Sequence, residues 1–485
     1  MEETSLKKKT IQGTIWSAAD AFLGQGISFI IGLLLARMLT DKEYGLIGIC
    51  LIFNVILNGI VDSGFSNALI RKKEVTDRDY NTMFTTNMSI SILLYALLYL
   101  ASPWIAVFFA NTELTALIRV MGLILIINAL SITQLTILTK KIDFKTKTKA
   151  SLISAVCSGI LGVTMAFHDF GVWALVAQQL SRQVVYSACL WWFNRWLPKL
   201  TFYRESFHYM WGFGWKLLIS GLLNNIWNQL YLVVVGKCYS PSTLGQYTRG
   251  YEYANLFSSN LTTIIQRVSF PVLSEIQDDP ERIVCAYRKV IRMTMFVTAI
   301  CMISLGAVAE PLLYCLIGPQ WQEAADYLPL ICLSMSLYPL HAINLNMLQV
   351  QGRSDIFLYL EIIKKIIGIA PIAIGIYIDI YGMLWASIIT GIISLYLNAW
   401  YTGKKLNYSF WKQLRDVSSS YAIALVIAIA VYFLKELPYS YWVILPLQIT
   451  IGVLVGTLLC QFFKPYAYEE IKHIILARMR KTKKI

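Results

Sequence analysis

Charged residues are scarce in this chain. Of its 485 residues, only 14% are Asp, Glu, Lys or Arg, whereas 57% are hydrophobic. A soluble protein carries about 25% charged residues because most of its surface meets water. The composition therefore excludes a soluble multidomain protein and indicates that the whole chain is a membrane domain.

The sequence also lacks the patterns of an enzyme or a metal protein. Its nine cysteines lie mainly in apolar segments and show no CxxC or Cys/His ligand spacing. No GxxxxGK[ST], GxSxG or HExxH motif occurs. The loops between apolar stretches are too short for an extramembrane catalytic domain. We therefore expect no catalytic residues, no metal site and no enzymatic activity.

Apolar stretches of the roughly 20 residues needed to cross a bilayer recur along the chain. They predict an all-α polytopic membrane protein with about fourteen transmembrane helices. The first stretch follows Lys7 to Lys9 but is too long for a signal peptide, so we interpret it as a permanent helix. The expected spans are residues 13–36, 44–66, 82–108, 115–138, 150–168, 171–193, 212–236, 243–266, 288–314, 325–348, 355–377, 381–401, 417–435 and 441–463.

Basic residues alternate between the loops. The loops after the even-numbered spans are basic, as at 71–78, 140–149 and 404–412, whereas those at 111–113, 168–171, 318–323 and 379–381 have no Lys or Arg. By the positive-inside rule, both termini are cytoplasmic. The net charge is +14, and the lysines and arginines cluster beside the span ends. This placement indicates contact with anionic membrane lipids and not with nucleic acid.

An internal repeat relates the two halves. ArgMetLeuThr at 37–40 followed by Gly45 matches LysCysTyrSer at 237–240 followed by Gly245, an offset of 200 residues. Gly171 likewise opens the sixth span as Gly382 opens the twelfth. We expect two pseudo-symmetric six-span lobes at 1–200 and 201–405, an added helix pair at 406–463 and a basic cytoplasmic tail at 464–485. Repeated lobes with an even number of spans are typical of transporters.

The expected spans contain several cations, of which five are candidates for an internal site. Placing Lys or Arg at the centre of a lipid-facing helix costs roughly 2.5 to 3.5 kcal/mol, or roughly 12 to 18 kcal/mol for all five. They should therefore face a hydrated internal cavity. Because they outnumber the carboxylates at these depths, the cavity should favour an anion. The cations are Arg182, Lys216, Arg249, Lys364 and Lys365; the carboxylates are Asp20, Asp62, Glu252 and Glu361.

Local ion pairing is an alternative interpretation of these charges. Arg249 with Glu252, and Glu361 with Lys364 or Lys365, have the spacing of pairs on one helix face. Lys216 shares a face with Asn224 and Asn228 but lies near enough to a span end to extend its amine to the interface. Asp20 and Asp62 lie on polar faces of the first two spans. Such a carboxylate could bind a coupling Na⁺ or H⁺, or simply hydrogen-bond another helix.

Several segments resemble the polysaccharide transporter (Wzx-type) family of the multidrug, oligosaccharidyl-lipid and polysaccharide (MOP) flippase superfamily. They are LeuAlaArgMetLeuThr at 35–40, AspSerGlyPheSerAsnAlaLeuIleArg at 62–71, PheGlyValTrpAlaLeuValAlaGlnGln at 170–179 and LeuGlyGlnTyrThrArgGlyTyr at 244–251. The resemblance covers about residues 10–405 and implies a MATE-like fold. It also implies that Tyr231 replaces a carboxylate that many relatives carry in the seventh helix.

The resemblance implies a bacterial inner-membrane flippase for undecaprenyl-pyrophosphate-linked oligosaccharide, used to assemble O-antigen of lipopolysaccharide, capsule or exopolysaccharide. A glycan polymerase and other assembly proteins would be its partners. The buried cations would then contact the pyrophosphate or acidic sugars. Three rivals stay open: a multidrug antiporter of the same superfamily, a lipid II flippase, and a membrane glycan polymerase. A cationic cavity disfavours the first, and short outer loops disfavour the last.

Overall fold

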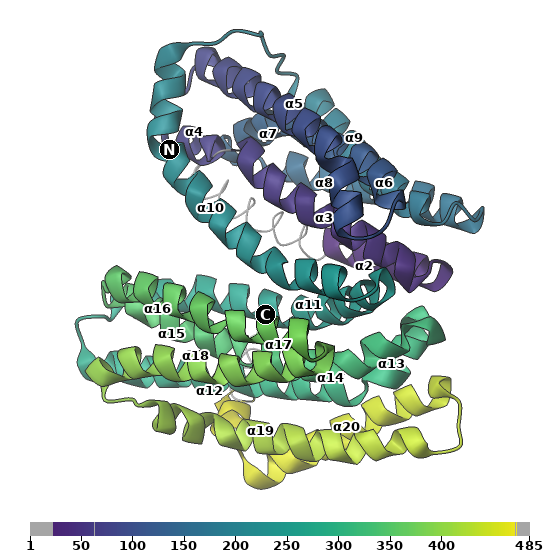
Figure 1. Cartoon of the computed structure of the whole chain (residues 1–485). Coiled ribbons are helices and arrows are strands. Elements are labelled where there is room, and N and C mark those ends of the chain that lie inside the picture. The colour runs from purple at the N-terminus through teal and green to yellow at the C-terminus, as the bar shows by residue number, and fades with distance from the viewer. Residues whose placement is uncertain (1–22, 63, 471, 473–485) are drawn as a thin grey trace, which may run out of the picture. The chain divides into compact units, whose positions relative to one another are not determined.

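The computed structural model describes residues 23–62, 64–470 and 472, and every element in these ranges is helical (Figure 1). The predicted all-α fold is thus confirmed. The helices are α2 (Gln25–Met38), α3 (Asp41–Asp62), α4 (Phe65–Arg71), α5 (Asp77–Phe108), α6 (Glu113–Met121), α7 (Leu123–Lys140), α8 (Phe144–Phe167), α9 (Val172–Asn194), α10 (Arg204–Cys238), α11 (Pro241–Glu275), α12 (Pro280–Ala307), α13 (Ala309–Ile317), η2 (Pro319–Trp321), α14 (Gln322–Ser336), α15 (Tyr338–Val350), α16 (Ser354–Ile367), α17 (Ile369–Tyr377), α18 (Ile380–Leu406), α19 (Phe410–Tyr432), η3 (Phe433–Glu436) and α20 (Tyr441–Phe463).

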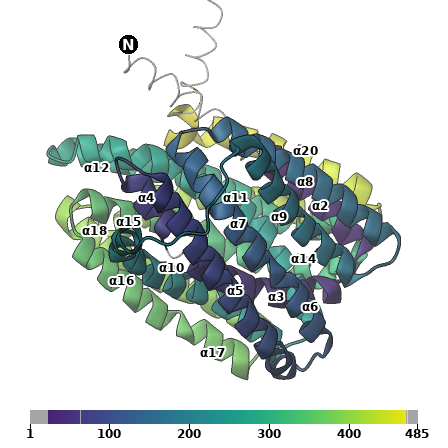
Figure 2. The ribbon, with the colours of Figure 1, turned by 90° about the horizontal axis from the view of Figure 1, so that it is seen from above.

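The chain forms two compact units, the first ending at Gly245 and the second beginning at Gln246. In the first unit, α8 and α9 form a hairpin and lie side by side (Figure 2), while α10 packs on α3 and α4. In the second unit, α12 packs against α14 and α19, and α20 packs against α19 and α13. The start of α11 therefore belongs to the first unit and the rest of that helix to the second. The lobe boundaries expected at residues 200 and 405 stay a prediction.

Aspartates fix the starts of several helices. The Asp143 carboxylate accepts a hydrogen bond from the Thr146 amide at 3.1 Å, and Asp279 accepts one from the Arg282 amide at 3.0 Å. Each satisfies an amide that has no partner within its own helix. Pro280 then occupies the first position of α12, where the missing N–H costs nothing. These caps explain why α8 and α12 begin at residues 144 and 280, earlier than the spans expected from 150 and 288.

A glycine breaks the second expected span. Gly64 has a φ of +71°, a conformation that side chains disfavour, and it separates α3 from α4. A Cβ atom at Gly64 would also lie 2.9 Å from the Gly214 carbonyl oxygen of α10. The break therefore allows α10 to pass close to the chain at the point where α3 ends.

The core of the second unit is an apolar cluster formed mainly by α12, α15, α18 and α19. It contains Tyr287, Ile291 and Met295 of α12, all fully buried, against Ile343 and Met347 of α15. Burying such side chains excludes lipid and fills the space between helices. The cluster packs these helices together at the end of the unit where α12 and α19 begin.

Ten helical stretches among the described residues are long and apolar enough to cross a membrane by length and composition. Within the described residues the apolar helix α2 is shorter, with 14 residues, and the start of the expected span 13–36 lies outside them. Helices α9, α11 and α16 are not among the ten, and they carry Arg182, Arg249 and Lys364. The chain is a multi-span membrane protein, and the expected spans that carry Arg182, Arg249 and Lys364 do not reach the length and apolarity of these ten.

Candidate functional site

The structure divides the predicted site residues between the two units. Those in the first unit are Asp62 on α3, Arg182 on α9, and Lys216, Asn224 and Asn228 on α10. Those in the second unit are Arg249 and Glu252 on α11, and Glu361, Lys364 and Lys365 on α16. Asp20 lies outside the described residues.

Helix α10 carries an exposed polar stripe. Lys216, Ser220, Asn224 and Asn228 follow one another at intervals of four residues and are all exposed. The neighbouring Asn225 instead lies against α3, where its Nδ2 would be 2.7 Å from a Cβ atom placed on Gly59. Exposed amides are costly next to hydrocarbon, so a stripe of them along a spanning helix suits contact with water. The residues predicted to share a face, Lys216, Asn224 and Asn228, are thus exposed on the first unit.

Amides join three helices inside the first unit. Asn128 Nδ2 of α7 donates to Asn58 Oδ1 of α3 at 2.7 Å, and Gln183 Nε2 of α9 donates to Asn128 Oδ1 at 3.1 Å. Gln183 Nε2 also lies 3.3 Å from Ser131 Oγ. Arg182, half-buried, immediately precedes Gln183 on α9. The network therefore holds the segment of α9 that carries this cation.

Asp62 is held by hydroxyl groups at the break between α3 and α4. Ser66 Oγ donates to Asp62 Oδ1 at 2.5 Å, and Thr136 Oγ1 of α7 donates to Ser66 Oγ at 3.1 Å. Hard cations prefer oxygen atoms as ligands, above all those of carboxylates. Among the described residues, no group of three or more His, Cys, Asp or Glu could hold a metal ion. Asp62 therefore presents a single carboxylate in a hydroxyl-rich setting.

Arg249 lies near the start of α11 in an ion pair with Glu252. Its Nη1 is 2.7 Å from Glu252 Oε2, and its guanidinium carbon is 5.9 Å from the ring centre of buried Trp321. The Arg249 side chain is 12% exposed, whereas Glu252 is 54% exposed. The local pair expected from the spacing is present. Because its carboxylate partner is mostly exposed, an incoming anion could replace Glu252 without stranding a buried charge.

The second predicted pair also forms. Lys364 Nζ and Glu361 Oε1 of α16 are joined by an ion pair, in which both side chains are partly buried. Lys365, the next residue, is half-buried. Residues 361–365 of α16 thus comprise one neutral pair and one further cation, so this part of the helix has a net positive charge.

Sequence reasoning missed several polar residues that fix these helices. Gln246 of α11 donates from Nε2 to the Gln320 carbonyl oxygen at 2.7 Å and accepts from the Ala324 amide at 3.0 Å. Asn128 and Gln183 were missed in the same way. The available signal was an amide within an apolar run, because such a group requires a partner in the membrane.

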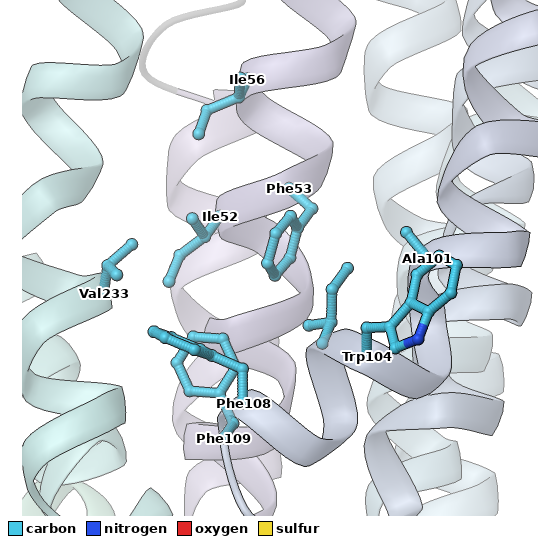
Figure 3. A pocket seen from close by; sticks show the side chains of 9 residues that line it. Ile52, Phe53, Ile56, Ala101, Trp104, Phe108, Phe109 and Val233 are labelled. Atoms are coloured by element: carbon cyan, nitrogen blue, oxygen red, sulfur yellow. The ribbon is translucent and has the colours of Figure 1, made fainter.

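An apolar cavity of about 380 Å³ lies in the first unit between α3, α5 and α10 (Figure 3). Ile52, Phe53, Trp104 and Val233 contribute to its walls. Its lining offers hydrocarbon contacts and lacks the convergent polar groups that orient a sugar. The cavity is therefore not the predicted anion site.

Several known proteins with similar sequences are polysaccharide biosynthesis proteins. A family model with the description "Polysaccharide biosynthesis protein" matches residues 34–326. The teichuronic acid biosynthesis protein TuaB of Bacillus subtilis (strain 168) is 23% identical over 98% of this chain and 99% of its own length. The succinoglycan biosynthesis transport protein ExoT of Rhizobium meliloti (strain 1021) is 24% identical over 94% of this chain and 92% of its own.

Two solved structures share the fold. The lipid II flippase MurJ, in an inward closed conformation, matches with a TM-score of 0.70 and 17% identity over 93% of this chain and 98% of its own. An inward-facing multidrug resistance MATE family transporter of the MOP superfamily matches with a TM-score of 0.61 and 15% identity, over 80% of this chain and 99% of its own. The predicted MATE-like fold is confirmed; identities this low carry nothing about substrate.

Proposed function

Because the chain belongs to the polysaccharide biosynthesis protein family, we propose that it flips undecaprenyl-pyrophosphate-linked oligosaccharide across the bacterial plasma membrane by alternating access. It is a multi-span polysaccharide biosynthesis transport protein of the MOP superfamily. The relatives whose names state an activity are transporters and flippases. As expected from the sequence, the chain is a transport protein and not an enzyme.

The observation that carries the proposal is the exposed polar stripe of α10. A purely structural scaffold has no use for amides, a hydroxyl and a lysine along a membrane span, whereas a transporter needs a wetted surface for a polar headgroup. Lys216, Asn224 and Asn228 would provide that surface. Hydroxyl and amide groups suit a glycan, and the amine suits its phosphate.

The cations of the remaining helices would bind the anionic part of the substrate. Arg182, Arg249, Lys364 and Lys365 would contact the pyrophosphate or acidic sugars, since guanidinium and ammonium groups both bind phosphate oxygens. When no substrate is bound, Glu252 and Glu361 would neutralise Arg249 and Lys364, with which they form ion pairs. Asp62 and Asp20 are candidates for binding a coupling Na⁺ or H⁺.

The proposal includes fourteen spans with both termini in the cytoplasm. Besides the ten apolar stretches, α2, α9, α11 and the pair α16–α17 would cross the membrane. Residues 1–200 and 201–405 would be the two lobes, and α19 and α20 the added pair. The basic tail after residue 464 would contact inner-leaflet lipids, and a glycan polymerase would receive the product.

The deciding experiment deletes the gene for this protein in its native cell. It then identifies the lipid-linked glycan that accumulates on the cytoplasmic leaflet. A flippase of this kind leaves an undecaprenyl-pyrophosphate oligosaccharide there, and re-expression clears it. Accumulation of lipid II instead would assign the chain to lipid II transport. If no lipid-linked intermediate accumulates, the proposed function is wrong.

A further inference from the structure

A polar cavity of about 440 Å³ lies in the second unit, apart from all predicted site residues. Its walls come from α12, α19 and the segment that follows α20. Three arginines line it, namely Arg288, Arg292 and Arg415, together with the hydroxyls of Ser419 and Ser420. We call this cavity the arginine pocket.

One buried carboxylate positions two of the arginines. Asp416, whose side chain is 4% exposed, forms ion pairs with both Arg288 and Arg292. Arg288 Nη2 lies 2.7 Å from Asp416 Oδ1, and the Tyr408 hydroxyl donates to Oδ2 at 2.8 Å. A single carboxylate cannot neutralise two guanidinium groups, and Arg415 adds another positive charge. The pocket therefore keeps about two excess positive charges on groups that are already oriented.

The chain beyond α20 completes the pocket. Lys464 adopts a left-handed conformation with φ of +44°, which ends α20 and turns the chain. Ala467 then packs in an apolar cluster with Phe296 and Ile423, and Lys289 forms an ion pair with Glu470. The Tyr466 ring centre lies 5.3 Å from the Arg292 guanidinium carbon. This segment is therefore held in place as a wall, so the pocket is a built part of the fold.

We propose that the arginine pocket binds the phosphate-bearing headgroup of a membrane lipid. Guanidinium groups with fixed orientation pair with phosphate oxygens in a fork, and serine hydroxyls supply further donors. The pocket lies near the starts of α12 and α19 and the end of α20. Trp411 of α19 and Phe462 of α20 are exposed near those ends and suit contact with acyl chains. Basic pockets between span ends are a recurrent form of anionic-lipid recognition.

This inference does not rest on the proposed transport or its substrate, and it uses only the topology that the charge pattern predicts. On the proposed topology the pocket faces the inner leaflet, where anionic phospholipids are abundant. Phosphatidylglycerol has the required phosphodiester and a net negative charge, whereas phosphatidylcholine has the phosphodiester but no net charge. A preference for the first lipid over the second is therefore the expected signature of the excess positive charge.

The test adds a carboxylate to the pocket without removing a partner of Asp416. Ser419→Glu places the new charge in the lining, while Ser418→Glu, on the exposed neighbouring position of the same helix, is the matched control. Arg415→Gln is a second variant that leaves both Asp416 ion pairs intact. The full-length chains are purified with phosphatidylglycerol and phosphatidylcholine, and retained lipid is counted by native mass spectrometry.

We expect wild type to retain phosphatidylglycerol about tenfold more than phosphatidylcholine, equivalent to about 1.4 kcal/mol. Ser419→Glu and Arg415→Gln should remove that preference, and Ser418→Glu should keep it. Equal retention of phosphatidylglycerol by all four proteins would overturn the proposal. Should Ser419→Glu unfold, as judged by its melting temperature against that of Ser418→Glu, Arg415→Gln alone decides the outcome.

Competition identifies the source of the headgroup. Displacement of bound phosphatidylglycerol by undecaprenyl pyrophosphate would indicate that the pocket serves a lipid-linked substrate, and persistence would indicate a phospholipid. Displacement by inorganic phosphate at equal concentration would overturn recognition of a lipid. Because retention is measured on purified protein, it is independent of whether glycan intermediates accumulate in cells.

Discussion

Among single residues, Arg249 is the most direct test of transport. Replacing Arg249 by Ala removes a mostly buried guanidinium while leaving Glu252, which is exposed and tolerates the loss of its partner. If Arg249 binds the anionic headgroup, surface glycan should fall at least about tenfold, which corresponds to about 1.4 kcal/mol of lost interaction. Surface glycan is measured by gel and antibody, and protein amount by immunoblot of membranes.

Arg353→Ala is the control for that measurement, because Arg353 pairs with Asp355 in an exposed position at 2.9 Å. It removes an equal charge from the same unit without touching the interior. Unchanged glycan in the Arg249 variant, or an equal loss in both, would remove Arg249 from the transport mechanism.

Asn344 is a second residue with a measurable role, here in stability. It is fully buried, and its Oδ1 accepts hydrogen bonds from the Tyr287 hydroxyl at 2.8 Å and the Thr402 hydroxyl at 2.7 Å. Its Nδ2 donates to Gln413 Oε1 at 3.0 Å. Asn344→Ala leaves several buried groups without partners, at roughly 1 to 3 kcal/mol each. Tyr287→Phe removes only one hydroxyl and should cost about 1 kcal/mol.

Thermal or denaturant unfolding of the purified protein in detergent would rank the two variants. If Asn344 is central to the network, Asn344→Ala should lower the stability more than Tyr287→Phe does. An equal or smaller loss than in Tyr287→Phe would mean that the surrounding groups find other partners.

At the scale of helices, hydropathy was sufficient to predict the long apolar helices, because each spanning helix must satisfy its own backbone. It did not predict the breaks that divide expected spans, such as those between α3 and α4 and between α16 and α17. Faces within one helix were also predictable, as the Lys216 stripe shows. Partners across helices were not. A period of 3.6 residues says which side chains share a face, but it says nothing about which helix meets that face. The contacts of Asn128 with Gln183, and of Gln246 with Gln320, depend on packing alone.

The starts of α3 and α11 meet through two glycines that the sequence aligns at an offset of 200. A Cβ atom on Gly45 would overlap the Pro241 carbonyl, and one on Gly245 would overlap the Asp41 carbonyl. Backbone atoms cannot move aside cheaply, so Gly45→Ala and Gly245→Ala should each destabilise the protein by about 1 to 3 kcal/mol. The melting temperature in detergent is the measurement.

Gly221→Ala is the matched control for this contact. It lies within α10, and a Cβ atom there meets nothing within 4 Å. Because Ala favours a helix over Gly by about 1 kcal/mol, this variant should be neutral or slightly more stable. Similar melting temperatures for all three variants would show that the two helix starts are not in close contact.

At the scale of the whole molecule, the orientation in the membrane is a matter of charge, and helix geometry does not determine it. The alternation of basic and uncharged loops predicts that residues near Thr112 face outward and those near Lys141 face inward. Both residues are exposed and lie next to helix ends, so a cysteine at either position should not disturb packing. The exposed native cysteines, Cys157, Cys238, Cys285 and Cys301, are first replaced by serine.

In intact cells, a membrane-impermeant maleimide should then label Thr112→Cys and leave Lys141→Cys unlabelled until the membrane is permeabilised. The two positions flank a single predicted span, α6 with α7, so opposite labelling also shows that this stretch crosses the bilayer. Labelling of Lys141→Cys from outside would show that the topology is the inverse of the predicted one. It would also move the arginine pocket to the outer leaflet, where its excess positive charge would meet a different set of lipids.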